Sequence, residues 1–87
     1  MPWIIIVYDV NEKKVNRMRK ICEPYIKRVQ RSVFEGQISV SGLRILVDSI
    51  KNFIDEEKDS VRIYEFREDR RGKLIELGNQ IKNTNIL

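Results

Sequence analysis

The sequence predicts a single α+β domain that spans residues 1–87. Two observations predict this class. Helical and strand-like hydrophobic patterns alternate along the chain, and 87 residues are enough for one domain only. A chain of this length buries only roughly 60 to 65% of its unfolded surface, so a subunit partner would help it to complete a core. We therefore expect one small domain that forms an oligomer.

The first strand is predicted at Trp3 to Tyr8, a continuous run of β-branched and aromatic residues after Pro2. Such a run is typical of a strand that is buried on both faces and is therefore central in a sheet. Asp9 and Asn11 end it. The run is far shorter than the ~20 apolar residues that cross a bilayer. Because the N-terminus also has neither a basic leader nor a small-residue cleavage site, we expect a cytoplasmic protein without membrane association.

A helix is predicted next, with Asn11 as a plausible N-cap. Apolar residues recur at spacings of three and four, which is the pattern of an amphipathic helix. These residues are Val15, Met18, Cys22 and Tyr25 or Ile26. Pro24 should end or kink the helix because it lacks a backbone N–H. Cys22 lies on the apolar stripe, so we expect a core residue rather than a reactive thiol.

The segment from Arg28 to Ile38 has imperfect strand alternation. Its apolar parity changes between Val33 and Phe34, which predicts either two short strands or a bulge. The clearest helical stripe of the sequence follows, and either Ser39 or Ser41 could cap it. This stripe consists of Leu43, Leu46, Val47, Ile50, Phe53 and Ile54.

Three further segments follow this helix. The acidic turn from Asp55 to Asp59 lacks the alternation and the glycine of a calcium loop, so we expect a solvated turn. Val61 to Phe66 is predicted as a strand, Arg67 to Gly72 as a charged loop and Lys73 to Leu77 as a short final strand.

This order places both helices on one face of a mostly antiparallel sheet. It is the ferredoxin-like βαββαβ arrangement with an extra short C-terminal strand. The other sheet face is then bare. One of two pairs must be buried on that face, either Tyr64 with Phe66 or Val61 with Ile63. The simplest cover is the same face of a second copy, so we expect a homodimer.

The composition limits the chemistry that is available to the chain. The absence of histidine excludes Ser-His-Asp and Cys-His catalysis, acid/base chemistry by histidine, and zinc sites that contain histidine. The single cysteine excludes an intrachain disulfide and a four-thiolate metal site. Catalysis would have to use carboxylates, a bound hard cation, hydroxyls or basic side chains.

Positive charge is concentrated in residues 10–31, which hold eight basic side chains against Glu12 and Glu23. Because the whole chain carries +4, the remaining residues are net acidic. This concentration is typical of a surface that binds a phosphate backbone, by shape and with a strong dependence on salt. The alternative is a solvated helix face. The basic residues are Lys13, Lys14, Arg17, Arg19, Lys20, Lys27, Arg28 and Arg31.

Tyr8 and Asp9 end the first strand, where a carboxylate would lie half-shielded at the edge of the sheet. Magnesium takes one or two protein carboxylates together with waters and substrate phosphates. A two-fold axis near Asp9 would supply the second carboxylate, and the cation could then activate a water for phosphodiester hydrolysis. The alternative is that Asp9 caps the helix that begins near Asn11. Ser32 likewise has two possible roles, a phosphate contact or a strand hydroxyl without a function.

Four segments together resemble the small CRISPR-associated Cas2 family. They are Tyr8-Asp9-Val10, the basic helix, Arg28-Val-Gln-Arg-Ser-Val-Phe-Glu-Gly36 and Asp59-Ser60-Val-Arg-Ile-Tyr64. The resemblance implies a ferredoxin-like homodimer whose two sheets face each other. It also implies a short C-terminal strand that reaches onto the partner, a role for Lys73 to Leu77 or for Ile86-Leu87.

The resemblance further implies a function in spacer acquisition, the step at which CRISPR immunity gains new sequences. In this family a Cas2 dimer bridges two dimers of the Cas1 integrase and supports duplex DNA. Many members are also described as metal-dependent endonucleases that act on single-stranded RNA or double-stranded DNA. By the same resemblance, Asp9 and Tyr8 would be the catalytic residues, and Asp9 would be a Mg²⁺ ligand paired with its symmetry mate.

The resemblance also assigns residues to nucleic-acid binding. Residues expected to hold or orient nucleic acid are Arg17, Arg19, Arg31, Ser32 and Phe34, and those that would extend the phosphate track by charge are Lys13, Lys14 and Arg28. Two alternatives stay open: a toxin-like ribonuclease of the VapD type, and a non-catalytic RNA-binding ferredoxin-like module. The second alternative lacks the aromatic and glycine signature expected on its central strands.

Overall fold

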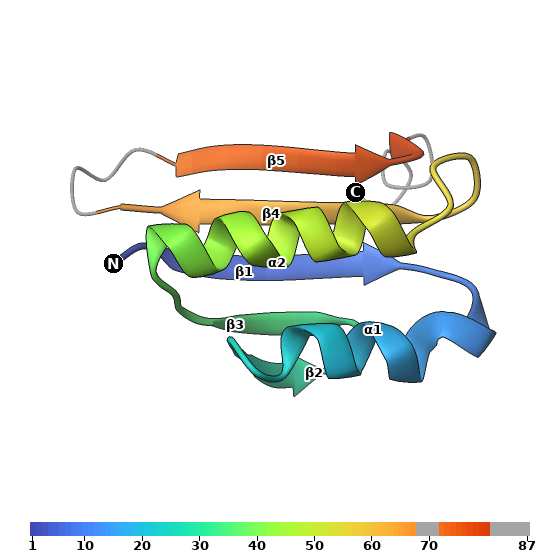
Figure 1. Ribbon diagram of the computed structural model, residues 1–87, viewed down its shortest axis with the longest axis horizontal. Helices are drawn as coiled ribbons and strands as arrows, with labels where there is room; N and C mark the ends of the chain where they lie inside the picture. The colour runs from blue at the N-terminus through green and yellow to red at the C-terminus, as the bar shows by residue number, and fades with distance from the viewer. Residues whose placement is uncertain (68–71, 81–87) are drawn as a thin grey trace.

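The structure is a computed structural model that describes residues 1–67 and 72–80. Its elements, in chain order, are β1 (Trp3–Asp9), the 3₁₀ helix η1 (Glu12–Lys14), α1 (Val15–Cys22), β2 (Lys27–Gln30), β3 (Val33–Gln37), α2 (Val40–Phe53), β4 (Ser60–Phe66) and β5 (Gly72–Gly78). This order confirms the predicted ferredoxin-like βαββαβ arrangement with one extra strand. Both helices cover the same face of the sheet (Figure 1).

The five strands form one antiparallel sheet in the order β2-β3-β1-β4-β5. As predicted from its unbroken apolar run, β1 is central. It pairs with β4 along its whole length, from Trp3 opposite Phe66 to Asp9 opposite Ser60. In Figure 1, α1 lies over the β2–β3 side of the sheet and α2 lies over β1 and β4. Because β1 and β4 are antiparallel, the end of β1 and the start of β4 lie at the same end of the sheet, which we call the strand-end rim.

The core lies between the helices and the sheet. Ile6 and Ile63 face each other across β1 and β4, and Met18 of α1 and Leu46 of α2 are fully buried with them. Val61 and Ile63 therefore belong to the helix-covered face, which resolves the alternative left open by the sequence. Cys22 is also buried in this cluster, and burial raises the pKa of its thiol to about 12. It is a core residue, as predicted.

Neither described helix covers the opposite face of the sheet (Figure 1), which carries several exposed apolar side chains. Trp3 and Phe66 are directly opposite each other there, and each is 44% exposed. Tyr64 lies on the same face, and Leu74 of β5 is paired with it. We call this surface the open face. Neither helix has the length and apolar character that would let it cross a membrane.

The caps and breaks follow the local sequence. Asn11 accepts a hydrogen bond from the Lys13 N–H at 3.0 Å, so it caps η1, which leads directly into α1. The helix ends at Cys22, before Pro24. The following strands include both features that the parity change predicted as alternatives, since β2 and β3 are separate strands with a register shift after Arg28. Ser39 caps α2 by accepting from the Gly42 N–H at 3.0 Å.

The final strand is longer than the predicted Lys73 to Leu77. It runs from Gly72 to Gly78 and pairs with β4 of the same chain at all seven positions. The inner edge of β5 is thus fully used within the single chain, and the reach of this strand onto a partner by its outer edge stays a prediction. Ile86-Leu87, the other candidate for that role, lies outside the described residues. Gly78 has φ +82°, and a side chain there would overlap the Asp59 carbonyl oxygen.

Candidate functional site

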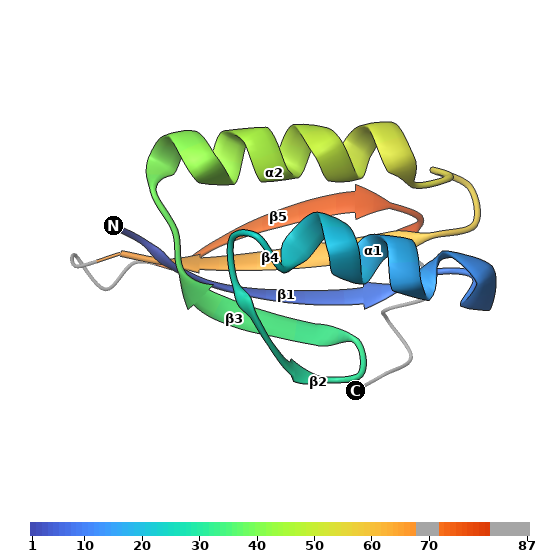
Figure 2. The same cartoon turned by 60° about the horizontal axis from the view of Figure 1, so that its bottom comes forward.

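Exposed basic side chains gather on α1, β2 and the residues beside them. We define the α1–β2 basic surface as the six exposed residues Lys13, Arg17, Lys20, Lys27, Arg28 and Arg31. The elements that carry them lie together along the β2 edge of the molecule (Figure 2). Clustered, solvated cations produce a positive potential that attracts a phosphate backbone and gives no base-specific readout. The structure thus brings together most of the predicted phosphate track.

Lys14 and Arg19 differ from these six because each is paired within the chain. The Lys14 ammonium lies 2.8 Å from a carboxylate oxygen of the buried Asp59 and 5.8 Å above the centre of the Phe53 ring. The charge of Lys14 is therefore paired inside the fold, and Lys14 does not belong to the α1–β2 basic surface. The Arg19 guanidinium lies 2.8 Å from Glu23 one turn along α1. Exposed pairs of this kind are weak, so Arg19 can exchange Glu23 for a phosphate.

Phe34 does not lie on the surface. Its side chain is 0% exposed and stacks on the Tyr8 ring with the ring centroids 6.1 Å apart. The prediction that Phe34 contacts nucleic acid is therefore wrong, because its strand directs it towards the helices and into the core. Ser32 is half-buried in the turn before β3, and its carbonyl accepts from the Tyr8 N–H at 3.1 Å. Its hydroxyl keeps both roles that the sequence left open.

Tyr8 is also a packing residue. It is 4% exposed, and its hydroxyl donates to the Arg31 carbonyl at 3.3 Å. Burial raises the pKa of Tyr8, and the nearby Cys22 adds to this rise. The phenol therefore stays protonated and cannot serve as a base near neutral pH. What it does in this structure is tie the end of β1 to the turn that carries Arg31.

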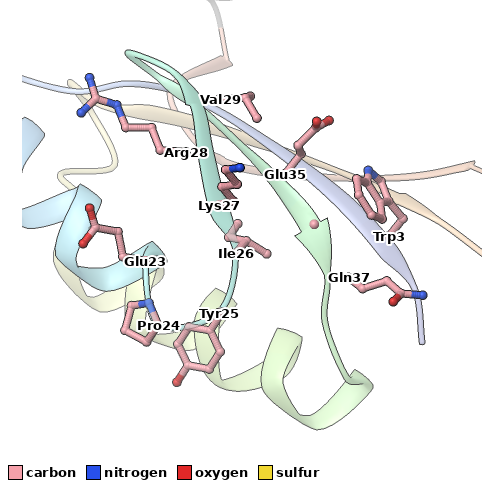
Figure 3. A pocket seen from close by; sticks show the side chains of 11 residues that line it. Trp3, Glu23, Pro24, Tyr25, Ile26, Lys27, Arg28, Val29, Glu35 and Gln37 are labelled. Atoms are coloured by element: carbon pink, nitrogen blue, oxygen red, sulfur yellow. The ribbon is translucent and has the colours of Figure 1, made fainter.

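A groove adjoins the basic surface at the β2 edge. It has a volume of about 860 Å³, and its walls come from the loop after α1, from β2 and β3, and from the start of β1 (Figure 3). Lys27 and Arg28 belong both to this groove and to the basic surface. Trp3 adds an exposed indole to the wall and Glu35 a carboxylate. The groove therefore extends the basic surface with an aromatic wall.

Asp9 is exposed at the strand-end rim, on the open face. Its carboxylate makes no hydrogen bond or ion pair with any described residue. The alternative that Asp9 caps the following helix is wrong, because Asn11 provides that cap. Nowhere in residues 1–67 and 72–80 do three or more carboxylate or thiol side chains gather as a metal site would require. Asp9 thus fits Mg²⁺ only as one ligand of an incomplete set, to be completed by phosphates, waters or a second copy.

Asp59 is a residue whose role the sequence did not predict. It is 1% exposed, although it closes a turn that we expected to be solvated. Its carboxylate accepts from the Lys14 ammonium at 2.8 Å, the Asp55 N–H at 2.9 Å and the Asn11 N–H at 3.3 Å. Burial raises the pKa of Asp59, but the hydrogen bonds from Asp55, Lys14 and Asn11 outweigh it and hold the pKa below its ordinary value. Asp59 thereby fixes the chain that leaves β1 just after Asp9.

Comparison with known proteins supports the resemblance seen in the sequence. Residues 1–74 match the family model for the CRISPR associated protein Cas2. The chain belongs to the Cas2 family. The match favours this family over the VapD-type ribonuclease and the RNA-binding module that the sequence had left open.

Curated relatives and solved structures agree with this assignment. The CRISPR-associated endoribonuclease Cas2 of Thermotoga maritima is 47% identical over 62 residues, which cover 71% of each chain. The protein of the same name from Methanothermobacter thermautotrophicus is 41% identical over 68 residues, 78% of this chain and 75% of the relative. A Cas2 crystal structure that is 45% identical superposes with a TM-score of 0.69 over 75% of this chain and 74% of that one. Streptococcus pyogenes Cas2, 32% identical, gives 0.67 over 71% and 82%.

Proposed function

We propose that this Cas2-family protein serves CRISPR immunity in spacer acquisition, as a homodimer that binds duplex DNA and bridges the Cas1 integrase. The observation that carries the proposal is the α1–β2 basic surface, whose six cations are exposed on neighbouring elements. The Cas2 family assignment supports the CRISPR role. The contrast with Lys14, whose charge is satisfied inside the fold, shows that the six are not needed for the fold's own ion pairs.

DNA binding would rest on phosphate contacts. Arginine and lysine side chains that reach phosphates release counterions, so affinity falls steeply with salt and depends little on base sequence. Each contact contributes roughly 0.9 to the slope of log K against log salt. A duplex laid along α1 and β2 would therefore be held in register by charge and shape, which suits a support that must accept any new sequence.

The homodimer would form through the open face. Trp3, Phe66 and Leu74 are each more than 40% exposed there, and single soluble chains seldom leave such a contiguous apolar surface uncovered. A two-fold axis through this face would give a dimer with two basic surfaces, one on each protomer. It would also place a second Asp9 on the same side of the assembly. This arrangement is what the dimer contributes to both binding and cleavage.

Cleavage of nucleic acid is a second function that a specific observation favours. The curated relatives are named endoribonucleases, and Asp9 is an exposed carboxylate with no partner in the described chain. Asp9 would bind Mg²⁺ together with the second Asp9 or with substrate phosphates, and the substrate would be single-stranded RNA or double-stranded DNA. When bound, Mg²⁺ polarises a phosphate and activates a water for hydrolysis. The basic surface would hold the strand, and Tyr8 would hold the rim in place.

The binding proposal is tested by the salt dependence of duplex affinity. We expect Arg17→Ala combined with Lys20→Ala to weaken binding of a labelled duplex and to lower the salt slope by roughly two units. The matched control is Lys51→Ala, which removes an exposed lysine from α2, outside the basic surface. Fluorescence anisotropy over a salt series measures both. Equal slopes for the wild type and the double variant would remove α1 from the binding surface.

A further inference from the structure

Asp59 joins segments that are far apart in the sequence. Its carboxylate accepts hydrogen bonds from the Lys14 ammonium at 2.8 Å and from the Asn11 N–H at 3.3 Å. Its carbonyl oxygen accepts from the Asn79 N–H at 2.7 Å, just after β5. Hydrogen bonds to an ionised group are roughly twice as strong as neutral ones. Asp59 therefore connects the start of the first helical segment, the start of β4 and the end of β5.

The same residue borders Asp9 on two sides. Asp59 directly precedes Ser60, which is the partner of Asp9 in the β1–β4 register. Its bond to the Asn11 N–H reaches the chain two residues beyond Asp9. The backbone of Asp9 is thus held by a strand partner on one side and through the Asp59 carboxylate on the other. Because the Asp9 side chain makes no hydrogen bond or ion pair with any described residue, only this backbone determines where its carboxylate lies.

Asp59 also holds the first turn of the basic helical segment. η1 buries no residue, and the two fully buried side chains of α1 lie further along the chain. The Lys14 ammonium contacts both the Asp59 carboxylate and the face of the Phe53 ring, so it attaches this turn to β4 and to α2. Arg17 follows three residues later on the exposed side of α1. The place of the α1–β2 basic surface relative to Asp9 is therefore fixed through Asp59.

We infer that Asp59 is a positioning residue, which sets where Asp9 lies relative to the basic surface that holds the strand. The inference rests on the proposed function, which assigns binding to the basic surface and cleavage to Asp9. A strand bound along α1 and β2 presents to Asp9 the phosphate that the spacing between the two regions selects. A displacement of about 1 Å at a reacting group can cost roughly 100-fold in rate, so a rigid connection between the regions matters for cleavage. Lys14 acts with Asp59 in this connection.

The first arm of the test compares cleavage of an end-labelled strand by the wild type and by Asp59→Asn at saturating protein, where affinity no longer limits the rate. We expect the variant to cleave about 10-fold more slowly and at a shifted or broader set of positions, with the salt slope of binding unchanged. Lys14→Met should show the same changes. Lys14→Arg, which keeps the cation, should retain the wild-type rate and positions.

The control for lost stability is Leu43→Ala. It removes a buried side chain in the first turn of α2, whereas Lys14 contacts Phe53 in the last. At a temperature at which every variant is folded, Leu43→Ala should cut at the wild-type rate and positions. An equal loss in Leu43→Ala and Asp59→Asn would reduce the role of Asp59 to stability and overturn the inference.

The second arm needs neither metal nor cleavage. Residual dipolar couplings of the backbone amides, measured in chelator, report the orientation of α1 relative to the sheet. We expect Asp59→Asn to change this orientation and the exposed control Asp48→Asn to leave it as in the wild type.

Two results in Asp59→Asn would overturn the inference: an unchanged orientation of α1, or Asp9-dependent cleavage at the wild-type rate and positions. Equal cleavage by the wild type and Asp9→Ala would instead remove the proposed cleavage role by itself. The couplings would then still decide whether Asp59 holds α1 in place against the end of β1.

Discussion

The α1–β2 basic surface and the strand-end rim carry charge in opposite ways. On the basic surface six cations are solvated and remain available to an external anion. At the rim, Asp59 is buried and takes three hydrogen bonds from the chain itself, while Asp9, at the end of β1, takes none. The difference indicates that a charged side chain without a partner inside the fold is the better candidate for a function, because it can still bind an external ion. By this criterion we propose Arg17 and Asp9 as functional residues, whereas Lys14 and Asp59 stabilise the fold.

The largest effect on stability is expected at Phe34, which the sequence assigned to nucleic-acid binding and which the structure places in the core. Phe34→Ala should lower the free energy of unfolding by about 3 to 5 kcal/mol, because it opens a cavity beneath Tyr8. Urea denaturation measures this loss. Val29→Ala, a truncation on the exposed strand β2, should change stability by only about 0.5 kcal/mol. A Phe34→Ala variant as stable as the wild type would return Phe34 to the surface.

Asp59 is the residue whose replacement should destabilise the strand-end rim. Asp59→Asn should lower the free energy of unfolding at pH 7 by about 2 to 4 kcal/mol, since it removes the charge that Lys14 and two backbone N–H groups bind. Asp48→Asn on the exposed side of α2 is the matched control and should be neutral. If the two variants were equally stable, Asp59 would be an ordinary surface carboxylate.

The stability that Asp59 contributes should also depend on pH. The pKa of Asp59 is lowered in the folded chain from its ordinary value of 3.8, so the folded state binds this proton less readily than the unfolded chain. Its contribution to stability is therefore present above that ordinary pKa and is lost as the pH falls through the lowered one. The gap in unfolding free energy between the wild type and Asp59→Asn should narrow below pH 3.8. Chemical denaturation at a series of pH values measures this gap. A gap that stays constant down to pH 2 would contradict this account.

A smaller effect separates cations within the basic run. Arg17→Ala should reduce the salt slope of duplex binding by about one unit, and Arg19→Ala by no more than that, because Glu23 already shares its charge. Lys14→Ala should leave the slope unchanged and lower stability instead. Anisotropy titrations and thermal unfolding of the three variants measure both quantities. A Lys14→Ala variant with a reduced slope would place Lys14 back among the phosphate contacts.

The smallest effect is expected for the stability of Asp9→Ala. Its carboxylate is exposed and has no partner in the described chain, so the unfolding free energy should change by only about 0.5 kcal/mol. Urea denaturation beside Asp59→Asn gives the direct contrast between a free and a satisfied carboxylate. A large loss in Asp9→Ala would make this residue a structural one.

Sequence patterns predicted the elements whose signals are local. The apolar run of β1 indicated a central strand, and the stripe of α2 with its Ser39 cap indicated that helix. The role of Asp59 could not be predicted in this way, because its partners Lys14 and Asn11 lie 45 and 48 residues away along the chain. Phe34 was misplaced for another reason: the parity of its short strand changes at that position, so the sequence alone does not show which face it occupies.

Of the candidate site, the sequence predicted the position of Asp9 and most of the basic surface. It did not predict which cations are already paired, since that depends on contacts between distant segments. Charge patterns therefore locate a surface, and the fold decides which of its residues are available.

The central claim is that binding and cleavage reside on separate regions. The most direct test measures duplex affinity and the Mg²⁺-dependent cleavage rate side by side for Asp9→Ala and for Arg17→Ala combined with Lys20→Ala, with chelator as a reference. We predict that Asp9→Ala loses cleavage on the order of 100-fold, since a metal ligand is removed, and keeps its affinity and salt slope. The double variant should lose affinity and slope, and it should cleave normally once saturated. Equal cleavage by the wild type and Asp9→Ala, or a salt slope that the double variant leaves unchanged, would contradict the account.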